Sequence, residues 1–166
     1  KPGWDIQGPY KGLIYAKTSS MLKTLEGLVS RPVMDEIIKT YFEAYKFKHP
    51  KEKDFRRIVK EVLAKKNVVL DQDLFFEQCL HGTEVCDYQL TEIKNEPTGD
   101  GYLSSFTAEQ LGGLIFPVDI AIEFENGNKE IVSWNGRNKK KTIEFESDSK
   151  LISAHIDPEQ KIFLDS

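Results

Sequence analysis

The sequence has only two cysteines, Cys79 and Cys86, and no apolar run that approaches the length of a membrane span. Two thiols do not make a disulfide framework, so we expect them to be free and partly buried in a reducing compartment, which favours the cytoplasm. A bridge between the two cysteines is the alternative. No segment resembles a signal peptide, although the chain begins with Lys1 and not with methionine.

The composition is that of a folded chain. Its 166 residues are 39% hydrophobic and 30% charged, which suits one domain or two small units that share an interface. The net charge of -4 combines a basic first half with an acidic second half, and this asymmetry suggests two units. The basic residues are spread over helix surfaces and not gathered with aromatics in one stripe, so we expect no nucleic-acid binding.

The first half has the periodicity of helices. Apolar residues recur at helical spacing from Leu13 to Val29, and again from Pro32, which suits a first helical turn, to about Tyr45. Two further helices are predicted, one opened by Pro50 with acidic residues in its first turn, and a short one with Asp71 as N-cap that ends near Gly82.

The second half has the periodicity of β-strands. Alternation of polar and apolar residues predicts strands at 88–93, 118–124, 130–134, 141–145 and 151–156, with residues 96–101 as a turn or loop. Asn126-Gly127 and Asn135-Gly136 are turn signals between them. We therefore predict an α+β fold: about four helices in a helical domain at 1–83, then a small antiparallel β-sandwich at 84–166.

Several short motifs occur in a fixed order. They are Tyr15-Ala16-Lys17 with Leu22 and Leu25, then Tyr41-Phe42, Phe47-Lys48-His49-Pro50 and Asp54-Phe55, and later Gly113–Val118, Trp134-Asn135-Gly136 and Ile156-Asp157-Pro158. In this order they resemble the M1-family zinc metallopeptidases, of the membrane alanyl aminopeptidase type, just downstream of the zinc site. Thr18 stands where that family has glycine, and Cys79 where a tryptophan is common.

The zinc motif of that family, His-Glu-x-x-His, is absent from the sequence. The resemblance therefore implies a C-terminal fragment: the last helices of a catalytic domain and the following β-sandwich. In the intact parent, the upstream catalytic domain would hold zinc and act on the N-terminus of a peptide substrate. We expect no zinc and no peptidase activity in this fragment alone.

Tyr15 is the catalytic candidate that the resemblance implies. A tyrosine hydroxyl stays protonated at neutral pH, so it can donate a hydrogen bond to the oxyanion that forms when the scissile carbonyl is attacked. The structural alternative is a helix-start tyrosine packed at a domain edge. Tyr10, followed by Lys11-Gly12, is a rival, but its spacing to the leucines does not fit.

Other polar residues have simpler interpretations. Lys17 could orient Tyr15 or contact substrate, but we favour a solvated lysine. Cys79, His81 and Cys86 lack the regular spacing of a zinc site, and we favour His81 as a helix-end residue. His49 and His155 are isolated from each other. Asp119, Glu123 and Glu125 share the polar face of one strand, which favours a solvated face over acid–base work.

Two alternatives of a different class remain open. The parent could be a non-catalytic M1-like scaffold or protein-binding module, and Thr18 in place of glycine is the feature in its favour. The chain could also be an unrelated binding module built from helices and a sandwich.

Overall fold

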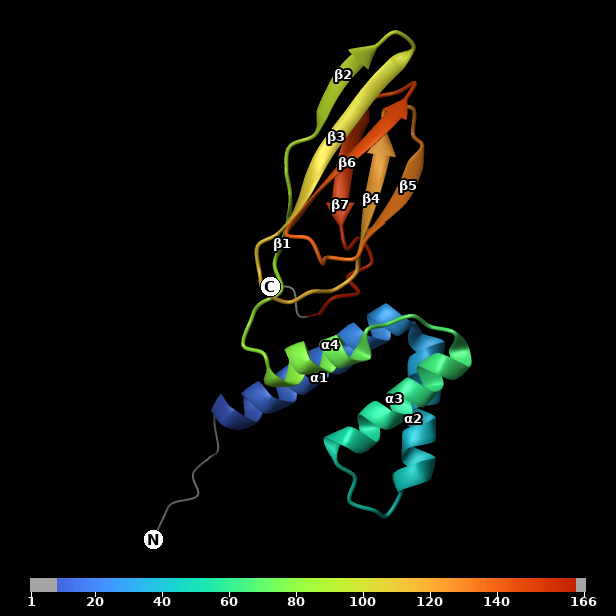
Figure 1. Cartoon of the computed structure of the whole chain (residues 1–166), viewed down its shortest axis with the longest axis vertical. Helices are drawn as coiled ribbons and strands as arrows, with labels where there is room; N and C mark the ends of the chain where they lie inside the picture. Colours follow the sequence, from blue (N-terminus) through green and yellow to red (C-terminus); the bar gives the residue numbers. More distant parts are fainter. Residues whose placement is uncertain (1–8, 164–166) are drawn as a thin grey trace. The chain divides into compact units, whose positions relative to one another are not determined.

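The computed structural model describes residues 9–163, with side chains from Tyr15 onward. Four α-helices precede the antiparallel strands in this range, which confirms the predicted α+β class (Figure 1). The helices are α1 (Pro9–Val29), α2 (Arg31–Tyr45), α3 (Glu52–Lys66) and α4 (Gln72–Phe76), which runs into the π-helical turn η1 (Glu77–His81). The strands are β1 (Tyr88–Leu90), β2 (Lys94–Thr98), β3 (Gly101–Gln110), β4 (Val118–Phe124), β5 (Lys129–Trp134), β6 (Lys140–Ser147) and β7 (Leu151–Ile156).

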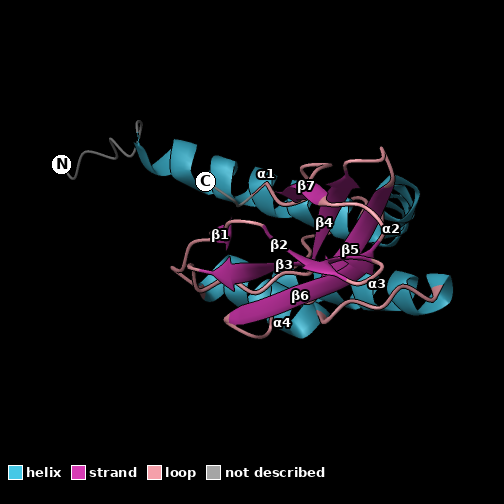
Figure 2. Cartoon of the chain, turned by 90° about the horizontal axis from the view of Figure 1, so that it is seen from above, coloured by secondary structure: helices cyan, strands magenta, loops and turns pink. Residues whose placement is uncertain are grey.

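The described residues divide into two compact units. The helical unit contains residues 9–82 and 161–163, and the two-sheet unit contains residues 83–160. Figure 2 distinguishes their helices and strands by colour. Residues 161–163, at the far end of the predicted second domain, therefore belong to the helical unit, and the assignment of the two halves to peptidase domains stays a prediction.

Local capping sets the ends of the helices. The Asp54 carboxylate accepts a 2.8 Å hydrogen bond from the backbone N–H of Lys51 at the start of α3, and this bond lowers the pKa of Asp54. Asn67, in the left-handed conformation at φ 54°, ends the same helix. Pro50, expected to open α3, lies just outside it. The predicted N-cap Asp71 does accept a hydrogen bond from the backbone N–H of Leu74.

Aromatic rings join three of the helices. The ring of Phe55 in α3 packs edge-on against Tyr41 of α2 at 5.3 Å and against Phe76 of α4 at 6.0 Å between centroids. Ile37 and Val59 are completely buried beside them. Figure 1 shows α2 and α3 as an antiparallel pair. The apolar stripes that the sequence predicted for these helices therefore form the core of the helical unit.

The segment 161–163 packs against α1. The backbone N–H of Phe163 donates a 3.0 Å hydrogen bond to the Thr24 hydroxyl, which is completely buried. One turn further on, Gly27 lies so close to the segment that a Cβ atom there would be 2.3 Å from the carbonyl oxygen of Lys161. Only a residue without a side chain permits this approach.

The two-sheet unit consists of two antiparallel sheets. In the first, β3 pairs with β6 along one edge and with β1 and β2 along the other; in the second, the order is β5-β4-β7 (Figure 1). The inward side chains of β4 are fully buried, as its alternation predicted, and Phe124 meets Phe145 of the other sheet with ring centroids 6.2 Å apart. Trp134 and Tyr88 pack edge-on at 5.5 Å in the same core.

Strand β3 was not predicted from the sequence. Residues 96–101 were expected to be a turn or loop, but β2 reaches Thr98, β3 starts at Gly101, and Thr98 and Gly101 pair across the turn. The inner face of β3 presents Ser104, Ala108 and Gln110, all buried, beside Phe106. Small and polar side chains at inward positions hide the apolar alternation that identifies a strand.

A polar link joins the two sheets. The Asn95 amide nitrogen donates to the carbonyl oxygen of Leu151 at 3.1 Å, and the Leu151 N–H donates to Asn95 Oδ1 at 2.9 Å. The buried Ser104 hydroxyl donates to the same oxygen at 2.6 Å. The Asn95 side chain thus satisfies both backbone groups of Leu151, as a neighbouring strand would.

The contact between Gly27 and Lys161 predicts an unusual response to alanine. In a helix interior, Gly→Ala ordinarily stabilises by up to about 1 kcal/mol. Here we expect Gly27→Ala to lower the free energy of unfolding by about 1–3 kcal/mol, because the methyl group overlaps the backbone of Lys161. Urea denaturation followed by helical circular dichroism measures this change. Gly99→Ala is the control, since nothing lies within 4 Å of that position; equal stability of both variants would contradict the packing.

The polar link predicts that the Asn95 amide contributes to the stability of the two-sheet unit. Asn95→Ala leaves the N–H and carbonyl of Leu151 without this partner, so we expect a loss of about 2–4 kcal/mol in the free energy of unfolding. Glu96→Ala, at the exposed neighbouring position, should change stability by no more than about 0.5 kcal/mol. Urea denaturation followed by tryptophan fluorescence reports the difference. Matching midpoints for the two variants would show that the link contributes nothing.

Candidate functional site

Tyr15 lies in the second turn of α1, because the helix begins at Pro9 and not at Leu13 as predicted. Its side chain is 72% exposed, and the whole stretch 15–19 is exposed. None of the described residues forms a hydrogen bond with its hydroxyl. The phenol is therefore held on a helix but is free to meet a group from outside these residues. The side chain of the rival Tyr10 lies outside the described residues.

Lys17 is exposed, as its interpretation as a solvated lysine expected, and it also forms a hydrogen bond that the sequence did not predict. Its ammonium donates a 3.0 Å hydrogen bond to the carbonyl oxygen of Gly82, 65 residues away in the chain. Gly82 ends η1, and its own N–H donates to the carbonyl oxygens of Glu77 and Gln78 at 3.1 Å. Lys17 thus caps a helix end where backbone carbonyls lack intrahelical partners.

Neither Cys79 nor Cys86 forms a disulfide, as predicted, and both are buried. Burial raises the pKa of the Cys79 thiol to about 11, and the nearby Lys17 ammonium opposes this rise. His81, at the end of η1, has its Nε2 atom 3.7 Å from Glu52 Oε1 and is half exposed. Among the described side chains, no three His, Cys, Asp or Glu residues are grouped as metal ligands.

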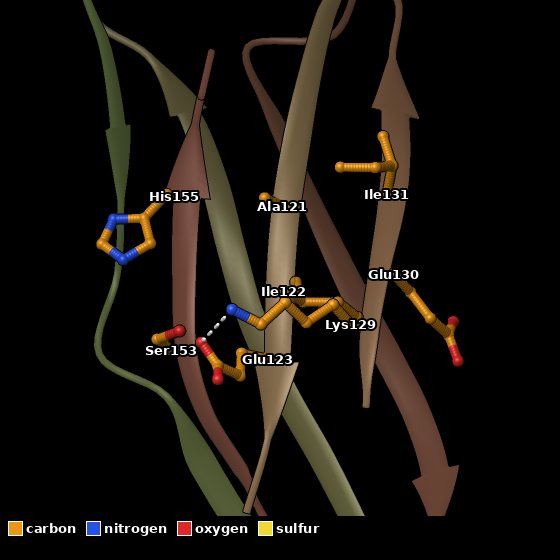
Figure 3. A pocket seen from close by; sticks show the side chains of 8 residues that line it. All are labelled: Ala121, Ile122, Glu123, Lys129, Glu130, Ile131, Ser153 and His155. Atoms are coloured by element: carbon orange, nitrogen blue, oxygen red, sulfur yellow. Dashed lines mark ion pairs between the residues drawn. The ribbon is translucent and has the colours of Figure 1, made fainter. Parts of the chain in front are cut away.

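A shallow depression of about 260 Å³ lies on the outer face of the β5-β4-β7 sheet. Figure 3 shows the side chains that line it. One cross-strand row contains Ile131, Ala121 and His155, and the next contains Lys129, Glu123 and Ser153. Because alternate residues of a strand share a face, the pairing of three strands brings these six side chains together.

The acidic residues singled out in the sequence do not form a catalytic pair here. Asp119 accepts a 2.7 Å hydrogen bond from the Ser133 hydroxyl, and Glu123 forms a 3.3 Å ion pair with Lys129. Glu125 lies beyond the end of β4 and is exposed. An exposed ion pair of this kind contributes little, about 0–1 kcal/mol, which fits a solvated strand face.

The sequence did not identify the depression, because its residues come from three separate strands. Ser153 and His155 do alternate with inward residues of β7, and that alternation was the available signal. Which strands flank β7, and in what register, is decided by pairing that the local sequence does not encode.

Comparison with solved structures finds a likeness in fold, whereas the comparisons with families and curated proteins find no match. The crystal structure of Legionella pneumophila aminopeptidase A in complex with aspartic acid is similar in fold, with a TM-score of 0.55 and 10% sequence identity. The likeness covers 78% of this chain and only 15% of that protein.

This likeness shows a shared fold and not a shared family. The chain has the fold of a small part of an aminopeptidase, and membership of the M1 family remains a proposal. None of the helices in the described range is both long and apolar enough to cross a membrane.

The raised pKa of Cys79 predicts a protected thiol. A rise from 9.0 to about 11 leaves roughly a hundredfold less thiolate in the folded chain near neutral pH. We therefore expect Cys79 to react with iodoacetamide at pH 8 at least that much more slowly in buffer than in urea. Mass spectrometry of the labelled peptides measures both rates, and equal rates would contradict the burial.

The raised pKa of Cys79 also makes the free energy of unfolding depend on pH. The folded chain favours the protonated thiol, so this stabilisation is present below pH 9 and is lost as the pH rises from 9 toward 11. Cys79→Ser, which does not titrate in this range, should remove that part of the pH dependence.

Proposed function

We propose that this chain is part of a zinc-dependent aminopeptidase of the M1 type and contributes the tyrosine that stabilises the transition state. The observation that supports the proposal most is the fold likeness to aminopeptidase A over 78% of the chain. The ordered motifs around Tyr15-Ala16-Lys17 and Phe47–Pro50 support it independently. They are features of the sequence, whereas the likeness is one of fold and is accompanied by only 10% sequence identity.

The placement of Tyr15 agrees with such a role. Its hydroxyl is exposed and has no partner among the described residues. A phenol hydroxyl can donate a hydrogen bond to an oxyanion. A donor aimed at developing charge stabilises the transition state more than the substrate, and this difference is what accelerates the reaction.

The described residues do not fit a zinc site. We propose that the zinc ligands of the enzyme belong to the upstream catalytic domain, because the His-Glu-x-x-His motif of the family is absent from this sequence. The upstream catalytic domain and a peptide substrate are the proposed partners. We propose accordingly that these 166 residues alone have no peptidase activity.

A non-catalytic scaffold is the second candidate. Thr18 replaces the glycine of the family motif and lies on the same exposed stretch of α1 as Tyr15. In that case the exposed stretch would bind a partner and not a transition state.

The proposal is tested in the longer protein that contains these residues. We expect chelator-sensitive hydrolysis of aminoacyl coumarin amides that zinc restores. Tyr15→Phe removes only the hydroxyl and should lower kcat by about 10²–10³. Tyr102→Phe removes the hydroxyl of a tyrosine in β3 of the two-sheet unit and is the matched control, expected to retain full activity.

Three results would count against the proposal. One is metal-dependent cleavage by the 166-residue chain alone. Another is an active longer protein in which Tyr15→Phe and Tyr102→Phe have equal rates. The third is a longer protein that binds no zinc and cleaves no aminoacyl substrate, which would favour the scaffold.

A further inference from the structure

The part of α1 at residues 15–19, which contains Tyr15, is exposed to solvent. By contrast, Met21, Leu25 and Val29, further along the helix, are buried. Helical turns without tertiary packing are marginally stable in water and fray. Among the described side chains of 15–19, only Lys17 forms a hydrogen bond with another element.

The group that Lys17 binds is fixed in space. Gly82 fits so closely against the preceding turn that a Cβ atom there would be 2.4 Å from the carbonyl oxygen of Gln78. Its N–H is also bonded to that turn. The Gly82 carbonyl lies at the C-terminal end of the α4–η1 run, where partial negative charge favours a cation. Lys17 therefore binds a rigid acceptor of matching charge.

Helix geometry relates this bond to Tyr15. Each residue of an α-helix turns the side chain by about 100°, so positions two apart point about 200° apart. Lys17 faces Gly82, and Tyr15 consequently faces away from that contact, which agrees with its 72% exposure. One side of the helix is anchored and the opposite side presents the phenol.

We propose that Lys17 is a positioning residue that holds the exposed turn of α1 and thereby fixes the direction of the Tyr15 hydroxyl. This role rests on the proposed function of Tyr15. Lys17 touches neither substrate nor metal in this proposal. Its ammonium acts only through the bond to the Gly82 carbonyl, so arginine, which also donates hydrogen bonds from a permanent cation, should replace it.

The first test uses the 166-residue chain and needs no activity. Hydrogen exchange of the amides of residues 15–20 is compared in Lys17→Met, Lys17→Arg and Lys23→Met. Lys23 is the matched control, because it is on the same helix and pairs at 3.3 Å only with its neighbour Glu26. We expect Lys17→Met to accelerate exchange about three- to tenfold, since one charged hydrogen bond is lost. Lys17→Arg and Lys23→Met should leave it unchanged.

The second test uses the longer protein and separates positioning from mere folding. Lys17→Met should lower kcat while KM stays constant, and Lys17→Arg should restore kcat. In a Tyr15→Phe background, Lys17→Met should cause no further loss, because there is no hydroxyl left to position.

The outcomes distinguish the two proposals. Unchanged exchange in Lys17→Met, or losses that multiply with that of Tyr15→Phe, would overturn the role of Lys17 and leave Tyr15 catalytic. An active protein in which Tyr15→Phe has no effect would overturn the proposed function, and with it the positioning role, even where exchange shows that Lys17 holds the helix.

Discussion

The packing of residues 161–163 on α1 is the contact that completes the helical unit, because it brings a segment from the far end of the chain onto its first helix. The chain leaves the helical unit after Gly82 and returns to it at Lys161, beside Gly27. Residues 83–160 connect these two points. The entropic cost of closing a connection rises only slowly with its length, so a whole folded unit can lie between them. Because Gly27 has no side chain, the backbone of Lys161 can lie against α1 at this position.

The same helix has two different physical roles along its length. Its later turns, from Met21 to Val29, are buried and give α1 a fixed place in the helical unit. Its residues 15–19 are exposed and include Tyr15 and Lys17, and Lys17 is bonded to Gly82. In the proposed positioning role, packing at one end of the helix and a single charged bond at the other would together fix the direction of the phenol. A loop could not hold the same group as tightly.

The sequence predicted those parts of the structure whose signals are local. Apolar spacing identified α2 and α3 through residues such as Ile37 and Val59, and alternation identified β4. It failed at β3, because Ser104 and Gln110 occupy inward positions and are stabilised by hydrogen bonds and not by apolar character. Tyr15 was found through a motif, and its role stays a prediction. The bond from Lys17 to Gly82 and the depression beside Ala121 depend on tertiary contacts, for which no local pattern exists.

The side-chain amide of Asn95 also makes the two-sheet unit sensitive to chemical degradation. Asparagine is among the residues that degrade on prolonged heating, by loss of the side-chain nitrogen. In Asn95 that nitrogen donates to the Leu151 carbonyl, and a carboxylate in its place would set two acceptors against each other in a partly buried site. Ageing at one atom would therefore weaken the polar link between the two sheets, so the durability of this unit depends on covalent chemistry as well as on folding.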